Sequence, residues 1–188
     1  MNEFLIALGA NLPSGKGSPK ETLEAALNVL RTEYDCIIEV SRFFRTPCFP
    51  PGAGPDYVNA AASLSVDMTP QSVIKMLHDV ESLFGRERLN RWGMRCLDLD
   101  LLAFGDFVLP DLETYRRWLD LPLDRQKTET PTSLILPHPR VQDRAFVLVP
   151  LREVAADWRH PVLNRTIKEM YQALSPDDLA EIIPLDAP

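Results

Sequence analysis

Apolar residues recur at strand spacing in four separate stretches of the first part of the chain. These stretches are Phe4–Leu8, Cys36–Arg45, Val58–Val66 and Leu97–Phe104. In the second and third stretches apolar side chains alternate with smaller or polar ones, the period-two pattern of a strand with one buried face. We interpret the first and the fourth as short buried strands. The pattern therefore predicts four strands.

Two stretches with apolar residues at helical spacing lie between these strands. Each opens with a capping residue followed by proline: Ser18 precedes Pro19, and Thr69 precedes Pro70. The cap oxygen accepts a helix N–H, and proline suits the first helical turn. Gly85 supplies a stop for the second helix. The resulting order, β-α-β-β-α-β, is that of a ferredoxin-like unit, with helices packed on an antiparallel or mixed sheet.

The rest of the chain adds elements to this unit. We expect a short helix within Leu112–Leu119, an apolar strand over Ala145–Val149 and a last helix near Thr166–Glu169. The predicted fold class is therefore α+β: a ferredoxin-like βαββαβ core, an added C-terminal strand and helix, and an insertion after the fourth strand. We expect a single domain over residues 1–188, with 106–133 as the insertion and 152–188 as a C-terminal extension that contains a helix.

Composition and charge limit the classes of partner. The 188 residues include 20 lysines and arginines against 27 aspartates and glutamates, a net charge of −7. This charge disfavours non-specific binding to nucleic acid or to an acidic membrane surface, so a polyanion needs a local basic cluster. The three cysteines lack CxxC spacing, and no signal-peptide pattern is seen. No apolar stretch approaches the roughly 20 residues that span a bilayer, so we expect a cytoplasmic protein.

Asp98 and Asp100 flank Leu99 in the fourth predicted strand. Residues two apart in a strand point to one face, so the two carboxylates project together, about 6.5–7 Å apart at Cα. Carboxylate oxygens suit hard cations such as Mg²⁺, which takes substrate phosphates and water as further ligands. A solvated acidic face on an edge strand has the same pattern, so this motif alone leaves both interpretations open.

Four arginines precede this strand, and Glu87 is the only acidic residue among them. They are Arg86, Arg88, Arg91 and Arg95. Guanidinium groups bind phosphates through paired hydrogen bonds and keep their charge. A solvated loop that balances acidic neighbours is the alternative, and the adjacent aspartates make it the less favoured one.

Carboxylates for a metal and arginines for phosphate are together the components of a phosphoryl-transfer site. The sequence contains no GxxxxGKS/T, and therefore no P-loop, and it lacks the GxSxG and protein-kinase motifs. The chemistry indicated is phosphoryl transfer outside those classes.

Several further motifs, in one order along the chain, resemble the 6-hydroxymethyl-7,8-dihydropterin pyrophosphokinase family. They are residues 7–11 (ALGAN), 45–47 (RTP), 55–61 (PDYVNAA), 84–100 (FGRERLNRWGMRCLDLD), 136–138 (LPH) and 144–146 (RAF). The resemblance extends from about residue 4 to residue 151. Because several motifs occur in the right order, it is far more specific than the aspartate pair alone.

The resemblance implies transfer of the β,γ-diphosphate of ATP to the hydroxymethyl oxygen of the pterin, with release of AMP, in folate biosynthesis. Family members use two Mg²⁺ ions, which Asp98 and Asp100 would bridge here, while Arg86 and Arg95 would be mobile catalytic arginines. The implied partners are therefore ATP and the pterin, without nucleic acid or membrane. We expect a monomer, with dimerisation through the insertion as the alternative.

The remaining assignments follow the same motifs. Six residues would contact ATP: Glu81, Arg88, Arg91, Leu101, His138 and Arg144. Seven would bind the pterin: Thr46, Pro47, Phe49, Tyr57, Asn59, Trp92 and Phe146. A flat bicyclic ring favours aromatic faces on both sides, and its amide-like edge favours a donor and acceptor such as Asn59. Core packing is the alternative for Tyr57 and Phe146, and loop stiffening is the alternative for Pro47.

The sequence departs from the family pattern at two notable places. Met94 stands where the family usually has proline, and 106–133 is longer than the family norm. Two other functions stay open: a pterin- or nucleotide-binding homologue without activity, and an RNA-binding ferredoxin-like module. The RNA-binding alternative requires exposed aromatic residues in a K/R-G-F/Y-G/A-F-V pattern, which the sequence lacks.

Overall fold

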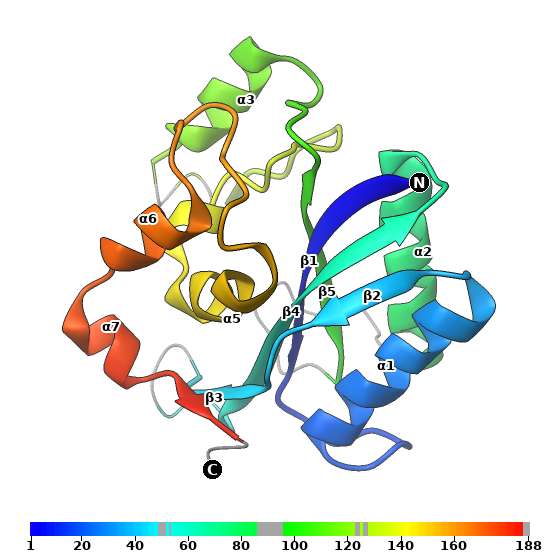
Figure 1. Ribbon diagram of the computed structural model, residues 1–188. Coiled ribbons are helices and arrows are strands. Elements are labelled where there is room, and N and C mark those ends of the chain that lie inside the picture. The colour runs from blue at the N-terminus through cyan, green and yellow to red at the C-terminus, as the bar shows by residue number, and fades with distance from the viewer. Residues whose placement is uncertain (49–51, 53, 86–95, 123–124, 126–127, 186–188) are drawn as a thin grey trace.

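The computed structural model describes residues 1–48, 52, 54–85, 96–122, 125 and 128–185. Its elements, in chain order, are β1 (Asn2–Ala10), α1 (Pro19–Glu33), β2 (Ile37–Val40), β3 (Phe44–Thr46), β4 (Tyr57–Val66), α2 (Pro70–Leu83), β5 (Asp98–Phe104), α3 (Leu112–Leu119), η1 (Val141–Asp143), α5 (Ala145–Ala155), α6 (Ile167–Gln172), α7 (Pro176–Ala180) and β6 (Ile183–Pro184). Figure 1 shows a central sheet between two groups of helices.

The sheet has the strand order β5-β1-β4-β3-β6, and β2 also pairs with β4. All of the pairings are antiparallel. If β2 and β3 are counted as one strand, the first four predicted strands lie in the order 4-1-3-2. The predicted α+β class and ferredoxin-like core are therefore confirmed.

Helices cover both faces of the sheet and create two separate cores. On one face, α1 and α2 pack on residues such as Ile6 and Leu8 of β1. On the other face, α5 packs on residues such as Leu5 of β1 and Ala61 of β4, and α6 packs on α5. Because successive strand residues point to opposite faces, β1 serves both cores, and Figure 1 shows α1 and α2 across the sheet from α5 and α6.

The predicted helix starts are confirmed. Ser18 forms a capping box with Glu21 at the start of α1, and the Thr69 side chain accepts a hydrogen bond from the N–H of Ser72 at the start of α2. After α2 the chain turns at Gly85, whose φ of +80° lies in the left-handed region that glycine adopts readily.

The strand expected over Cys36–Arg45 is divided into β2 and β3. Ser41 lies between them, and its Oγ accepts a hydrogen bond from the Ala61 N–H at 3.0 Å. A backbone carbonyl would occupy that position in a continuous ladder, so the serine side chain interrupts the strand.

The strand expected over Ala145–Val149 is wrong, because these residues begin helix α5. The helix lies between the sheet and α6, so it is apolar on several sides and shows no clear helical period. Two valines and the internal Pro150 add to the strand-like appearance. The added C-terminal strand is instead β6.

Other expectations for the second half are met. The helix expected within Leu112–Leu119 is α3. The helix expected near Thr166–Glu169 is α6, which opens with a capping box made by Thr166 and Glu169. Among the described residues, every helix is too short or too polar to cross a membrane.

Candidate active site

Asp98 and Asp100 lie on β5 and share one face of the sheet. Leu99 and Leu101, which alternate with them, are buried against α1 and α2 on the opposite face. In register beside the two aspartates, β1 carries Gly9 and Ala7. The neighbours in register on β1 are therefore small, and the two aspartates share one face as the sequence pattern predicts.

Arg144 lies next to this pair, immediately before the first residue of α5. Its Nη1 is 3.5 Å from Oδ2 of Asp100. The guanidinium also lies 5.8 Å from the centre of the Phe146 ring, whose side chain is 41% exposed. The start of α5 thus presents a cation and an aromatic ring beside the carboxylates.

His138 is held at the free edge of β5. Its backbone N–H donates to the Leu102 carbonyl at 2.7 Å, and its ring Nδ1 accepts a hydrogen bond from the Arg140 N–H at 3.0 Å. Desolvation and the nearby charges of Arg144 and Arg140 lower the pKa of His138 to about 3, although Asp98 opposes the shift. The ring is therefore neutral near pH 7, and because Nδ1 is an acceptor its proton is on Nε2.

Asn59 and Thr46 form a second polar pair on the same face. Nδ2 of Asn59 donates to Oγ1 of Thr46 at 2.7 Å, and both side chains are buried. Gly9 lies in register beside Asn59, and a Cβ on Gly9 would stand only 2.9 Å from Asn59 Oδ1. Glycine at position 9 is therefore what allows Asn59 to sit above β1.

Strand register joins the two groups. Asp98 pairs with Gly9, and Gly9 pairs with Asn59, so the three residues form a row across β5, β1 and β4. Neighbouring strands are about 4.8 Å apart, so Asp98 and Asn59 are separated by roughly 10 Å at Cα. One sheet face thus carries carboxylates at one end of a row and an amide at the other.

The other described pterin candidates lie around Asn59. Tyr57 is paired in register with Thr46 and is partly buried, while Pro47 is exposed directly after β3. Phe146 is exposed at the start of α5 on the same face of the sheet. Thr46, Tyr57, Asn59 and Phe146 are therefore brought to one face of the sheet from three elements.

Glu81 and Leu101, which the family motifs assign to ATP contacts, are both buried. Glu81 is only 1% exposed, and its Oε1 accepts a hydrogen bond from the Leu99 N–H at 2.8 Å. Leu101 is 4% exposed and belongs to the core beneath the sheet. Neither side chain offers surface to a nucleotide in this structure, and both instead support the strand that carries the aspartates.

Six predicted site residues lie outside the described residues: Phe49, Arg86, Arg88, Arg91, Trp92 and Arg95. Their predicted roles therefore stay predictions.

The described donors fit a divalent cation only in part. Asp98 and Asp100 provide hard oxygen ligands on one face, which suits Mg²⁺. Within the described ranges, no group of three or more histidine, cysteine, aspartate or glutamate side chains is arranged to hold a metal. A bound Mg²⁺ would need water or substrate phosphates as additional ligands, which is its usual behaviour with nucleotides.

Sequence reasoning gave no role to His160 or Tyr115, which form a buried pair. The hydroxyl of Tyr115 and Nε2 of His160 are 2.9 Å apart, and both side chains are fully buried. Nδ1 of His160 accepts hydrogen bonds from the N–H groups of Val162 and Leu163. The pair fastens α3 to the segment after α5, and no local sequence signal marks it.

Comparison with known proteins decides the family. Residues 5–156 match the model of the 7,8-dihydro-6-hydroxymethylpterin-pyrophosphokinase (HPPK) family. The chain belongs to the HPPK family. The matched range contains the aspartate pair, the Asn59 and Thr46 pair, His138 and Arg144, so the resemblance seen in the sequence is confirmed.

Curated relatives with the same enzyme name support this membership. The chain is 34% identical over 169 residues to 2-amino-4-hydroxy-6-hydroxymethyldihydropteridine pyrophosphokinase of Synechocystis sp., covering 89% of this chain and 74% of the relative. It is 33% identical over 153 residues to the enzyme of that name from Haemophilus influenzae, covering 81% of each chain.

A solved structure supports the fold. The HPPK-DHPS of Plasmodium falciparum matches with a TM-score of 0.64 and 18% identity over 91% of this chain. This chain spans only 40% of the length of that protein. At this identity the match bears on the fold, and it agrees with the ferredoxin-like core described above.

Family membership establishes the class of reaction. This HPPK is an ATP-dependent pyrophosphokinase of folate biosynthesis, and its substrates are ATP and the hydroxymethyldihydropterin. HPPK enzymes use ATP with Mg²⁺.

Proposed function

We propose that this HPPK binds MgATP at Asp98 and Asp100 and binds the pterin beside Asn59, on the same face of the sheet. The row Asp98–Gly9–Asn59 is the observation that carries the proposal. The row spans roughly 10 Å between the Cα atoms of Asp98 and Asn59. A hydroxymethyl group and a diphosphate can bridge this distance between the cation site and the pterin site.

On the ATP side, Asp98 and Asp100 would hold two Mg²⁺ ions. When bound, the ions neutralise phosphate charge and orient the triphosphate. Arg144 would exchange its 3.5 Å contact with Asp100 for an ATP phosphate, because a guanidinium binds phosphate through paired hydrogen bonds. His138, neutral with its proton on Nε2, would donate a hydrogen bond to a phosphate or to the ribose.

On the pterin side, Asn59 would recognise the amide-like edge of the ring. Its Nδ2 already donates to Thr46, which fixes the orientation of the amide and leaves Oδ1 as an acceptor above Gly9. Phe146 and Tyr57 would supply aromatic contacts to the ring faces. Pro47, with Phe49 and Trp92 of the family motifs, would complete the pterin site.

In the reaction, the hydroxymethyl oxygen attacks the β-phosphorus of ATP. The bond from that phosphorus to the oxygen shared with the α-phosphate breaks, AMP leaves with this oxygen, and the hydroxymethyl proton is released. Positioning and charge neutralisation provide most of the catalysis in such transfers. We assign charge neutralisation also to Arg86, Arg88, Arg91 and Arg95, which the family motif places before Asp98.

Product identity tests the reaction. The protein is incubated with ATP, Mg²⁺ and 6-hydroxymethyl-7,8-dihydropterin, and the nucleotides are separated. We expect AMP only when the pterin and the metal are both present. ADP would show transfer of a single phosphoryl group, and pterin binding without any turnover would support the non-catalytic alternative.

For assembly and location we propose a monomer in the cytoplasm. Both ligand sites described above are built within one chain, so they require no second subunit. Sedimentation at micromolar concentration tests this proposal, and a dimer that is lost on deletion of residues 106–133 would favour an interface through the insertion.

A further inference from the structure

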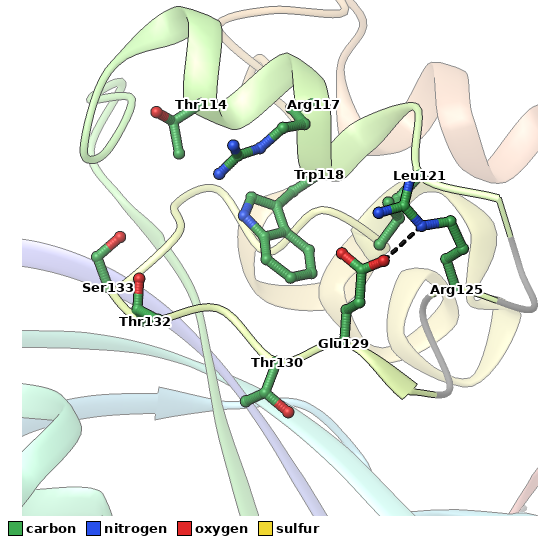
Figure 2. Close-up of a pocket in the computed structure, with 9 residues that line it drawn as sticks. All are labelled: Thr114, Arg117, Trp118, Leu121, Arg125, Glu129, Thr130, Thr132 and Ser133. Carbon is green, nitrogen blue, oxygen red and sulfur yellow. Dashed lines mark hydrogen bonds and ion pairs between the residues drawn. The ribbon is translucent and has the colours of Figure 1, made fainter.

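The segment that we expect to be an insertion carries an open cavity of its own. Its volume is about 350 Å³, and its described lining residues all lie between Thr114 and Ser133 in the sequence. Figure 2 shows the arrangement: α3 forms one wall, and the segment that carries Thr130, Thr132 and Ser133 forms the wall facing it. This volume lies within the range of small-molecule sites, which is roughly 300–1,000 Å³. Of the residues that we assign to ATP or to the pterin, none that the structure describes lines this cavity.

The wall made by α3 offers a cation beside an aromatic ring. Arg117 and Trp118 both line the cavity, and Figure 2 shows both side chains reaching into it. Neither side chain makes a hydrogen bond or an ion pair with any described residue, although hydrogen bonds from Thr114 and, to a smaller extent, the charge of Arg117 lower the pKa of Asp111. The neighbouring Arg125, by contrast, is already paired with Glu129. Arg117 is therefore the charge available to a ligand, and the indole offers a flat surface.

The facing wall offers hydroxyl groups. Thr130, Thr132 and Ser133 line it, and their hydroxyls have no hydrogen-bond partner among the residues described. Figure 2 shows the hydroxyls of Thr132 and Ser133 directed to the side of α3, and that of Thr130 directed away from it. Hydroxyls both donate and accept, so they suit phosphate, carboxylate or ring substituents alike. In a chain with a net charge of −7, Arg117 is the one charged side chain without an ion pair among the described lining residues, and a guanidinium favours anions.

Two hydrogen bonds fix this cavity to the rest of the molecule. Nη2 of Arg140 donates to the carbonyl of Leu121, a lining residue, at 2.9 Å. Arg140 also donates its backbone N–H to His138, so one residue contacts both the cavity wall and the ATP side of the active site. The buried Tyr115 and His160 pair anchors α3 from beneath. The wall formed by α3 and Leu121 is thus held in place without a ligand.

We propose that this cavity is a second ligand site, which binds a small planar ring carrying an anionic group. Arg117 would bind the anion, Trp118 would stack on the ring, and the hydroxyls of the facing wall would bind its polar edge. Two classes of compound combine a planar ring with an anionic group in this way. One is a nucleoside monophosphate, such as the AMP that the reaction releases, and the other is a simple aromatic carboxylate. The Arg140 link places this site in contact with the segment that carries His138.

The indole N–H signal of Trp118 reports binding at this site. The protein is labelled with ¹⁵N and titrated with AMP or benzoate up to millimolar concentration. Adenosine, which has the ring without the anion, and inorganic phosphate, which is the anion without a ring, are the controls. The signal is assigned with the Trp118→Phe variant. We expect AMP, benzoate or both to shift it in a saturable way, and the stronger of the two identifies the source. Adenosine and phosphate should bind more weakly.

Two arginines of the same helix provide matched variants. Arg117→Ala should weaken binding about ten-fold, since one charge-assisted contact is lost. Arg116→Ala should leave binding unchanged, because Arg116 is exposed on α3 and does not line the cavity. An unmoved Trp118 signal, or an equal effect of both variants, would overturn the proposal. The titration is repeated in the Asp98→Asn variant, so that its result does not depend on the proposed catalytic roles.

Discussion

The carboxylate of Glu81 in α2 is hydrogen-bonded to the backbone N–H of Leu99 in β5, with 2.8 Å between Oε1 and the nitrogen. Leu99 is the residue between Asp98 and Asp100, and β5 is the edge strand next to β1. A buried side chain on the opposite face of the sheet therefore satisfies the edge N–H between the two aspartates. We infer that Glu81 is a positioning residue for them.

The Glu81→Ala variant should be less stable and less active. Removing the carboxylate leaves the Leu99 N–H without this acceptor in a buried place, which costs about 1–3 kcal/mol. The Glu81→Gln variant keeps an oxygen acceptor and should recover most of the loss. Urea unfolding measures the stability, and the rate of AMP formation measures the positioning of the aspartates. Full activity and stability in Glu81→Ala would contradict the positioning role.

Gly9→Ala should weaken pterin binding. The new Cβ would stand 2.9 Å from Oδ1 of Asn59, so the amide must move from its place above β1. We expect the pterin Kd to rise about ten-fold, the effect of losing one good contact, while MgATP affinity changes little. Calorimetry measures both affinities.

Gly15→Ala is the matched control for this substitution, because nothing lies within 4 Å of a Cβ at position 15. An unchanged pterin Kd in Gly9→Ala, or the same rise in both variants, would show that the close approach of Gly9 to Asn59 has no bearing on the ligand.

Acid should destabilise the protein through His160. Desolvation lowers the pKa of this buried ring to about 4, against about 6.5 for an unfolded chain. Between these values the unfolded state binds a proton that the native state does not. The stability contributed by His160 is therefore complete above pH 6.5 and is lost as the pH falls towards 4. An NMR titration should show no protonation of His160 until the pH is close to 4, and a midpoint near 6.5 would contradict this.

Urea unfolding at pH 6.5 and pH 5 tests the consequence. The wild type should lose more stability between these pH values than His160→Gln, which lacks the titrating ring. His138, whose pKa is also lowered, titrates alike in both proteins and so cancels in the comparison.

Much of the core could be predicted from local sequence because local chemistry determines it. Proline after a capping residue marked the starts of α1 and α2, and alternation placed Asp98 and Asp100 on one face opposite Leu99. The strand break at Ser41 could not be predicted, since it depends on a hydrogen bond to Ala61, 20 residues away. Helix α5 was predicted as a strand because burial on several sides hides its helical period.

The candidate site shows the same limit. The family motifs named Asn59 and the aspartates, but only strand register shows that Gly9 lies between them. The burial of Glu81 and the pairing of Tyr115 with His160 depend on contacts between distant segments, which no motif records.

The row Asp98–Gly9–Asn59 places a cation site at one end and a pterin site at the other, and paired binding and turnover measurements on two variants test this division. Asp98→Asn keeps the shape of the side chain but removes its charge, and Asn59→Ala removes the amide. We predict that Asp98→Asn loses Mg²⁺-dependent AMP formation while its pterin Kd is retained, and that Asn59→Ala loses pterin affinity while its MgATP Kd is retained. Equal loss of both affinities in both variants, or unchanged turnover in Asp98→Asn, would contradict the account.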